Sequence, residues 1–379
     1  MIPVTPRGFK DVLPQEARWR EGICNDVQRV LSLWGYAPIE TPTLEVLEVL
    51  EMGGRLAQTP FRLFDADGDL LVLRPDVTLP IARMVASRLE DVARPLRFRY
   101  VQPVFREEES LRGQAREFTQ IGIESIGMAG APADAEVILL FVEALAACGL
   151  RDFNIAICTV GVLRDLLDAC MRDGAADAVW RTAVLDACHA SNLVEIERLA
   201  QDPRIDARCA GALKLLPTLN GKRDAIRACQ GLMAPLGCTD GLAQLEQTWD
   251  IIEALGAGPY VSVDFSVMSA FDYYTGLVFE AYAPGPGMML GSGGRYDHML
   301  EAYGKSAPAA GFAFGLERVM HALVAQGDEA EAVPAGGIPL VVPVSAANPA
   351  AAFAQAARLR AEGTTAILQT VEEGGDTGE

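Results

Sequence analysis

The sequence is poor in lysine and histidine and has no surplus of positive charge. Only four of its 32 basic residues are lysines, and only three histidines occur among 379 residues. Acidic residues outnumber basic ones by 51 to 32, so the formal net charge is −19. Because Lys and Arg supply most non-specific affinity for nucleic-acid phosphates, this balance argues against a general nucleic-acid surface. The many arginines instead suit bidentate contacts with single anions.

Long apolar runs and paired cysteines are also missing. No window of 18 apolar residues occurs, and the first residues lack a basic segment followed by an apolar run. These absences predict no membrane span and no secretory signal, and therefore a cytoplasmic protein. The eight cysteines include no Cys-x-x-Cys pair and do not cluster with the three histidines. We therefore expect reduced thiols, no metal site and no cofactor.

The composition is that of an ordinary globular protein. Half of the residues are apolar and 7% are aromatic. A chain of 379 residues is long enough for one large core and one or two smaller units.

The first 150 residues combine helical periodicity with strand patterns. Apolar residues spaced for one face predict a helix over Glu16 to Leu33, and the prolines that follow favour an extended segment over Ala37 to Leu44. An Asp/Gly turn between apolar runs predicts a hairpin over Phe61 to Arg74. Further strands are expected at Arg97 to Val104 and Phe118 to Gly127. This mixture predicts an α+β fold with a large antiparallel sheet flanked by helices.

Strand patterns become rare between about residues 161 and 250. Ala, Leu, Asp and Arg dominate the segments Val162 to Met171, Arg181 to Ala200 and Gly241 to Leu255. We expect a helical insertion there.

Strand patterns return at Tyr260 to Val267 and at Leu277 to Ala283, and the turn between them predicts a hairpin within the same sheet. A strand and a helix are expected over Gly311 to Gln326. Residues 326–337 have the composition of a linker, and residues 338–379 hold only a short α/β segment. The expected division is a core of residues 1–325, the linker, and this segment.

Five motifs resemble those of histidyl-tRNA synthetases, and together they span residues 1 to about 325. They are Trp34-Gly35-Tyr36 with Glu40-Thr41-Pro42, Leu73-Arg74-Pro75-Asp76-Val77-Thr78, Phe105-Arg106 through Glu124, Asp272-Tyr273-Tyr274-Thr275-Gly276, and Gly293-Gly294-Arg295-Tyr296-Asp297 with Gly311 to Arg318. Each motif alone is weak, but five in the right order are strong evidence. The resemblance implies a class II aminoacyl-tRNA synthetase-like fold.

The resemblance also implies a histidine site. Asp76, Thr78 and Gln120 would hold the backbone end of the amino acid, Glu124 and Tyr274 would hold its ring, and Tyr273 would line the site. Simpler interpretations stay open, because Glu124 fits a strand carboxylate bonded to a neighbour, Asp76 a helix N-cap, and the tyrosines core aromatics.

The sequence departs from the family pattern on the catalytic side. Ser269 stands where the synthetases carry a catalytic arginine, Gln114 replaces another arginine, and Glu107 begins an acidic run near the expected triphosphate position. A serine brings no positive charge to a developing pentavalent phosphate. Arg106 and Arg318 remain as possible anion contacts, or as ordinary salt-bridge partners. We therefore expect no catalytic residues.

The end of the chain points the same way. The synthetases end in an α/β anticodon-binding domain longer than the 42 residues that follow Gly337. The chain thus resembles the synthetase paralogues that serve as regulatory subunits of ATP phosphoribosyltransferase, the first enzyme of histidine biosynthesis. That resemblance implies a non-catalytic subunit, needed for transferase activity and for feedback inhibition by histidine. It also implies a dimer of this chain, a hetero-oligomer (an octamer in the family) with short-form catalytic subunits, and no tRNA partner.

Two other functions remain open at the level of sequence. The first is a divergent histidyl-tRNA synthetase-like enzyme that activates histidine with ATP, with Arg295 as the nearest replacement for the missing arginine. The second is a stand-alone histidine sensor without a transferase partner. Sequence does not place histidine in the old synthetase pocket rather than at a subunit interface.

Overall fold

The computed structural model is described over residues 4–53, 59–107, 115–172, 176–238, 240–267, 273–285, 289–327, 339–344 and 348–370. The chain divides into two compact units, Met1–Val12 with Arg20–Asp328, and Leu13–Trp19 with Glu329–Glu379. Within the described ranges, no helix has both the length and the apolar character needed to cross a membrane.

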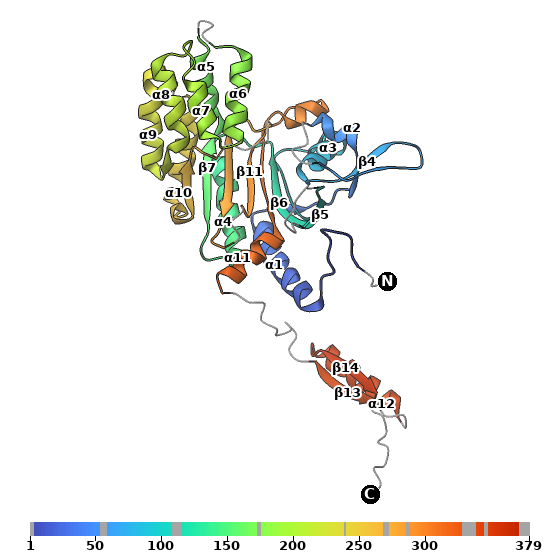
Figure 1. Ribbon diagram of the computed structural model, residues 1–379. Helices are drawn as coiled ribbons and strands as arrows, with labels where there is room; N and C mark the ends of the chain where they lie inside the picture. Colours follow the sequence, from blue (N-terminus) through green and yellow to red (C-terminus); the bar gives the residue numbers. More distant parts are fainter. Residues whose placement is uncertain are drawn as a thin grey trace. The chain divides into compact units, whose positions relative to one another are not determined.

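A nine-stranded sheet forms the centre of the first unit (Figure 1). In spatial order its strands are β1 Ala37–Pro38, β5 Leu96–Phe105, β6 Glu117–Ile126, β12 Ala309–Gly315, β11 Gly291–Arg295, β10 Leu277–Tyr282, β7 Asn154–Thr159, β9 Val261–Asp264 and β8 Asn220–Gly221. Neighbours are antiparallel except for the parallel pairs β1–β5 and β7–β9. The predicted α+β fold is confirmed, with a mixed rather than a purely antiparallel sheet.

Helices α1 Pro14–Leu33, α4 Ala131–Ala147 and α11 Leu316–Ala325 lie against this sheet (Figure 1). The α1 prediction is confirmed, and its buried residues Ile23, Val27 and Leu31 follow the helical period. The sequence did not indicate α4, because that helix is apolar on most faces and shows little amphipathic contrast. Its Phe141 ring stacks on Phe312 of β12 with the ring centroids 4.4 Å apart.

A smaller three-stranded sheet is formed by residues that precede helix α3 in the sequence. Its order is β2 Leu44–Val46, β4 Leu70–Leu73 and β3 Arg62–Phe64, all antiparallel, and it is flanked by α2 Leu47–Met52 and α3 Thr78–Arg88. The predicted β3–β4 hairpin is confirmed. Asp65 Oδ1 stabilises its turn by accepting the N–H groups of Asp67 at 3.0 Å and Asp69 at 2.8 Å.

Six α-helices connect β7 to β9 within the described part of this region. They are α5 Val160–Cys170, α6 Ala178–His189, α7 Leu193–Ala200, α8 Ala207–Leu215, α9 Arg223–Met233 and α10 Asp240–Ala254. Among the described residues of this connection, 3₁₀ turns lie at Leu216–Thr218, Ala234–Leu236 and Gly258–Tyr260, and a further one lies at Met299–Tyr303, after β11. The segment Arg181 to Ala200, which the sequence suggested as one helical run, is two helices. Ser191 between them has φ 49°, and Asn192 caps α7 by accepting the Glu195 N–H.

The predicted hairpin between Tyr260 to Val267 and Leu277 to Ala283 is wrong. Both strands exist and belong to one sheet, but β7 lies between them, antiparallel to β10 and parallel to β9. Sequence reasoning paired the neighbours in the chain, whereas β7, more than 100 residues ahead of β9, supplies the partner edge.

The second unit contains two parallel strands, β13 Leu340–Val344 and β14 Ala366–Thr370, joined by α12 Pro349–Ala361. Ala352 and Ala356 of α12 pack with Val342 and Ala366 in a small core. The predicted linker 326–337 lies almost wholly outside the described residues, which stop at 327 and resume at 339.

Candidate functional site

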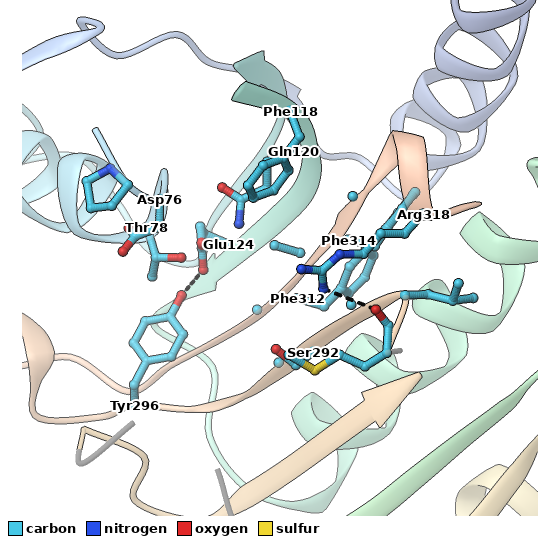
Figure 2. Close-up of a pocket in the computed structure, with 18 of the residues that line it drawn as sticks. Asp76, Thr78, Phe118, Gln120, Glu124, Ser292, Tyr296, Phe312, Phe314 and Arg318 are labelled. Carbon is cyan, nitrogen blue, oxygen red and sulfur yellow. Dashed lines mark hydrogen bonds between the residues drawn. The ribbon is translucent and has the colours of Figure 1, made fainter. Parts of the chain in front are cut away.

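A pocket lies over β6, β11 and β12 in the nine-stranded sheet (Figure 2). All eight residues singled out from the sequence line it, although they come from five separate stretches of the chain. They are Asp76, Thr78, Arg106, Gln120, Glu124, Tyr273, Tyr274 and Arg318.

Glycines in β11 and β12 provide the room for these side chains. A Cβ atom at Gly311 would lie 2.2 Å from Glu124 Oε2, and one at Gly294 would lie 2.7 Å from the Tyr274 ring. Side chains at these strand positions would therefore displace the groups of the pocket.

Glu124 is the most deeply buried acid of the pocket, with 2% of its surface exposed. Tyr296 donates its hydroxyl hydrogen bond to Oε2 (Figure 2). The Tyr100 hydroxyl lies 3.5 Å from Oε1. Burial raises the pKa of Glu124 to about 8, the nearby Asp76 carboxylate adds to the rise, and hydrogen bonds from Thr78 and Tyr100 oppose it. Near neutral pH this group is largely a neutral carboxylic acid, which can donate as well as accept a hydrogen bond.

Asp76 joins the pocket to the start of α3. Its Oδ1 accepts the Leu79 N–H at 3.1 Å, so the predicted capping hydrogen bond is present, although Val77 holds the cap position. Burial raises the pKa of Asp76, while the Leu79 N–H and the positive charge of Arg106 counteract that rise. Capping and pocket lining therefore coexist in one side chain.

Gln120 contributes a hydrogen-bond acceptor to the pocket. Its side chain is buried, and among the described residues Oε1 has no hydrogen-bond partner. A buried carbonyl oxygen without a partner is costly. Since this side chain lines the pocket, a ligand N–H group would remove that cost.

Aromatic rings form one wall near Glu124. The Tyr273 and Tyr274 centroids lie 4.8 Å apart, and the Tyr273 ring meets Tyr296 edge-on at 6.1 Å. Burial raises the pKa of both Tyr273 and Tyr274, so their hydroxyls stay neutral. Such a wall suits a flat ring with polar edges.

The opposite end of the pocket is cationic. The Arg106 guanidinium lies 4.6 Å from the Phe118 ring centroid, and that of Arg318 lies 5.9 Å from the same centroid. Arg106 donates to the Pro75 carbonyl at 3.0 Å and Arg318 to the Met289 carbonyl at 3.1 Å. Two guanidinium groups held at one ring provide an anion-binding end.

Sequence reasoning missed three residues of this site: Tyr100, Phe118 and Tyr296. Tyr296 is part of the motif Gly293 to Asp297, which had already been singled out from the sequence. Its place in that motif was the signal that could have marked it as a site residue. Tyr100 contacts Glu124 through the pairing of β5 with β6, which no short window of sequence reveals. Phe118 lies two residues before Gln120 on β6, so alternation along that strand was the available signal.

The departures from the synthetase pattern are only partly visible. Ser269 and Gln114 lie outside the described residues. Glu107 pairs with Arg116 at 3.2 Å. Arg295, the suggested replacement for the missing arginine, is 3% exposed, pairs with Asp134 at 2.7 Å and Asp297 at 2.9 Å, and does not line the pocket. Its charge is therefore already compensated by two carboxylates.

The described residues contain no cluster of three or more His, Cys, Asp or Glu side chains arranged for a metal ion. All eight cysteines are free thiols. The pocket can accept N–H groups and a flat polar ring at its acidic end and an anion at its arginine end.

Comparisons with known proteins agree with this geometry. The family model described as histidyl-tRNA synthetase matches residues 8–319. An ATP phosphoribosyltransferase regulatory subunit from Moorella thermoacetica is 36% identical over 365 residues, covering 96% of this chain and 91% of that protein. The chain belongs to this family of synthetase-like regulatory subunits. A second regulatory subunit, from Halalkalibacterium halodurans, is 38% identical over 84% of this chain and 79% of that protein.

Solved structures extend the relationship to the fold. A crystal structure from Bacillus halodurans, described as an ATP phosphoribosyltransferase regulatory subunit/histidyl-tRNA synthetase, superposes with a TM-score of 0.86 at 34% identity over 100% of this chain and 95% of that chain. A histidyl-tRNA synthetase from Nostoc shares the fold with a TM-score of 0.80 at 24% identity, over 99% of this chain and 87% of that one. The class II synthetase-like architecture predicted from the motifs is thus confirmed.

Proposed function

We propose that this chain is a non-catalytic regulatory subunit that assembles with ATP phosphoribosyltransferase catalytic subunits and binds free histidine in the pocket over β6. The regulatory-subunit relatives support the first part. The Gln120 Oε1 atom, which has no hydrogen-bond partner within the described part of the chain, carries the second, because it calls for a ligand with N–H groups near the buried Glu124.

Histidine fits the two ends of the pocket. Its ammonium group would donate to Asp76 and Gln120 beside Thr78, and its carboxylate would lie toward Arg106 and Arg318. Its imidazole would meet Glu124 and Tyr274, with Tyr273 at the wall. A neutral imidazole has one donor and one acceptor nitrogen, which matches a carboxylic acid and a phenol.

The chain is proposed to lack synthetase activity because neither Arg295 nor Ser269 replaces the catalytic arginine of the synthetases at the cationic end of the pocket. Arg295 is committed to Asp134 and Asp297, and Ser269 in the sequence brings no charge. The stand-alone sensor would need no partner, whereas the relatives are named as subunits.

The remaining parts of the proposal concern assembly. We infer a dimer of this chain within an octameric hetero-oligomer, a cytoplasmic location, no tRNA partner, and a division into a core of residues 1–325, a linker and a short α/β segment. Histidine can then inhibit only if it binds the low-activity arrangement of the complex more tightly than the active one.

Calorimetry with histidine tests the pocket. Glu124→Gln should weaken histidine binding by roughly 10- to 100-fold, since a buried hydrogen bond to a titratable partner is lost or mismatched. Glu117→Gln is the matched control, because Glu117 begins the same strand β6, is exposed, and does not line the pocket. Equal histidine affinity in both variants would show that histidine does not bind in this pocket.

Mixing experiments test the assembly. The activity of a short-form transferase subunit should rise on addition of the chain, and histidine should lower it again. Histidine-dependent pyrophosphate exchange should stay at background. Exchange above background would establish the synthetase-like enzyme instead, and histidine binding without any effect on the transferase would establish the stand-alone sensor.

A further inference from the structure

The outer face of the small sheet β2–β4–β3 is apolar, and among the described residues much of it is open to solvent. We propose that it is the docking surface for the transferase catalytic subunit, through which that subunit senses whether the pocket is occupied. This inference rests on the proposed function.

The strand register defines the docking surface. Val46, Leu71 and Leu63 pair in one row across the sheet, and Leu44 pairs with Leu73 in the next row, so all five side chains share a face. The opposite face carries the buried Val72 and Glu45, and Glu45 pairs with Arg83 of α3 at 2.7 Å. One face of the sheet is therefore packed at Val72 and Glu45, and the other face is aliphatic.

Part of the aliphatic face is open to solvent. Leu63 and Val46 are each 37% exposed, and Leu44 is similarly exposed. Phe64, which is 72% exposed, pairs with Leu70 at the hairpin end and belongs to the opposite face. The hairpin extends beyond α2 and α3 (Figure 1). Its inner end is shielded, where Phe61 contacts Phe9 with the centroids 5.9 Å apart and the Arg116 guanidinium lies 4.3 Å from the Phe61 centroid. Adjacent exposed aliphatic side chains of this kind mark an interaction surface.

The charge around this sheet selects the occupant. Residues 40–73 contain seven acids and two arginines. Glu45 is buried against Arg83 on the packed face, whereas Asp67 and Asp69 are exposed at the hairpin turn. A second copy of the chain related by a two-fold axis would bring acid against acid. A different protein with an apolar patch bordered by Lys and Arg fits better, and the catalytic subunit is the partner that the proposed function supplies.

The sheet is connected directly to the pocket. Strand β4 ends at Leu73, and Asp76 follows after only two intervening residues. Between them Arg74 is buried and donates to the carbonyls of Thr41 at 2.6 Å and Pro103 at 2.8 Å, while the Arg74 N–H bonds to the Thr43 carbonyl. A shift of β4 under a docked partner would therefore reach Asp76 through a short, fully bonded segment, which gives the two sites a physical route for coupling.

Binding titrations with the short-form catalytic subunit test the docking surface. Leu63→Arg and Val46→Arg each place a cation within the apolar face and should weaken subunit affinity by about tenfold or more. Val194→Arg is the control, because Val194 is 80% exposed on α7, away from this sheet in the chain and in the fold. Histidine calorimetry and thermal unfolding of each variant show that the pocket and the fold persist.

A second pair of substitutions tests whether acidic residues contribute to the contact with the catalytic subunit. Asp67→Asn combined with Asp69→Asn should lower subunit affinity several-fold at low salt and flatten its salt dependence. Neither carboxylate forms the turn, because Asp65 does.

The outcomes separate the two proposals. If the wild-type chain fails to bind or activate the catalytic subunit, the proposed function fails, and this inference with it. If the wild type binds and Leu63→Arg binds equally well, only the docking surface is wrong. If Leu63→Arg instead dissociates a dimer of the chain in sedimentation velocity, the face belongs to a second copy and the inference is overturned.

Discussion

Glu124 illustrates how burial changes the chemistry of a single residue. Exposed glutamates are anions near neutral pH, but this side chain is surrounded by Tyr100, Tyr296 and the Asp76 carboxylate, and burial raises its pKa to about 8. A neutral acid next to phenols offers donors and acceptors without a net charge. A site of this kind is better matched to a neutral imidazole ring than to a cationic ligand group.

The raised pKa makes stability depend on pH in a defined direction. Between the usual value of 4.5 and about 8, folded Glu124 holds a proton that the unfolded chain releases. The free energy of unfolding should therefore fall as pH rises through this window, by on the order of a few kcal/mol. In Glu124→Gln, which has no titrating group at this position, the free energy of unfolding should fall less steeply with pH. Urea unfolding of both proteins at a series of pH values measures it, and parallel curves would contradict the prediction.

Residue identities were predictable where the family motifs were dense. Asp76, Gln120 and Glu124 followed from motif resemblance, and the structure brings them into one pocket. Tyr100 could not be found in this way, because its approach to Glu124 depends on the pairing of β5 with β6. The commitment of Arg295 to Asp134 could not be found either, since 161 residues separate the two.

At the scale of elements, the pocket depends on strands that carry glycine where a side chain would be expected. Strands β11 and β12 include Gly293, Gly294 and Gly311, and pairing places Gly311 opposite Glu124. Glycine normally weakens a strand. Here the loss creates space for a buried carboxyl group.

Replacement of one of these glycines should damage both fold and binding. In Gly311→Ala the new Cβ would lie 2.2 Å from Glu124 Oε2 and 2.3 Å from the Ile123 carbonyl oxygen, so the backbone must shift. We expect the free energy of unfolding to fall by about 1–3 kcal/mol. Histidine affinity should fall as well.

Gly231→Ala is the matched control. This glycine lies within α9, and among the described residues no atom beyond its chain neighbours and the adjacent helix backbone lies within 4 Å of the position of its Cβ. The variant should gain about 0.5–1 kcal/mol, since alanine favours a helix interior. Chemical denaturation compares the two variants, and equal stabilities would show that the β12 strand accommodates a methyl group.

Elements with local signals were predictable, and their order in the sheet was not. The period of α1 and the Asp/Gly turn of β3–β4 are properties of short windows. The position of β7 between β9 and β10 depends on a pairing across more than 100 residues, and no short window contains it. The short break at Ser191 was hidden because apolar residues continue on both sides.

For the whole molecule, charge sets the range of partners. The net charge of −19 disfavours an extended contact with a polyanion, while Arg106 and Arg318 provide only a local anion site.

Transfer RNA binding should accordingly be absent. Filter binding at physiological salt should show no saturable retention of tRNA by the chain, with affinity no better than the weak non-specific range of about 10⁻⁴ M. A histidyl-tRNA synthetase assayed alongside serves as the positive control. Saturable binding that resists salt would contradict the proposed loss of the tRNA partner.

The parallel pairing of β7 with β9 has a kinetic consequence. Ile155 pairs with Val261, so this contact closes a loop that contains all six helices from α5 to α10. Closing so long a flexible loop carries an entropic cost that grows with its length, whereas the helices form through local contacts. The helical block is thus expected to condense first and to shorten the effective loop. The last strands of the sheet then join a scaffold that the insertion itself has prepared, which makes that insertion a participant in folding and not merely an attachment to the core.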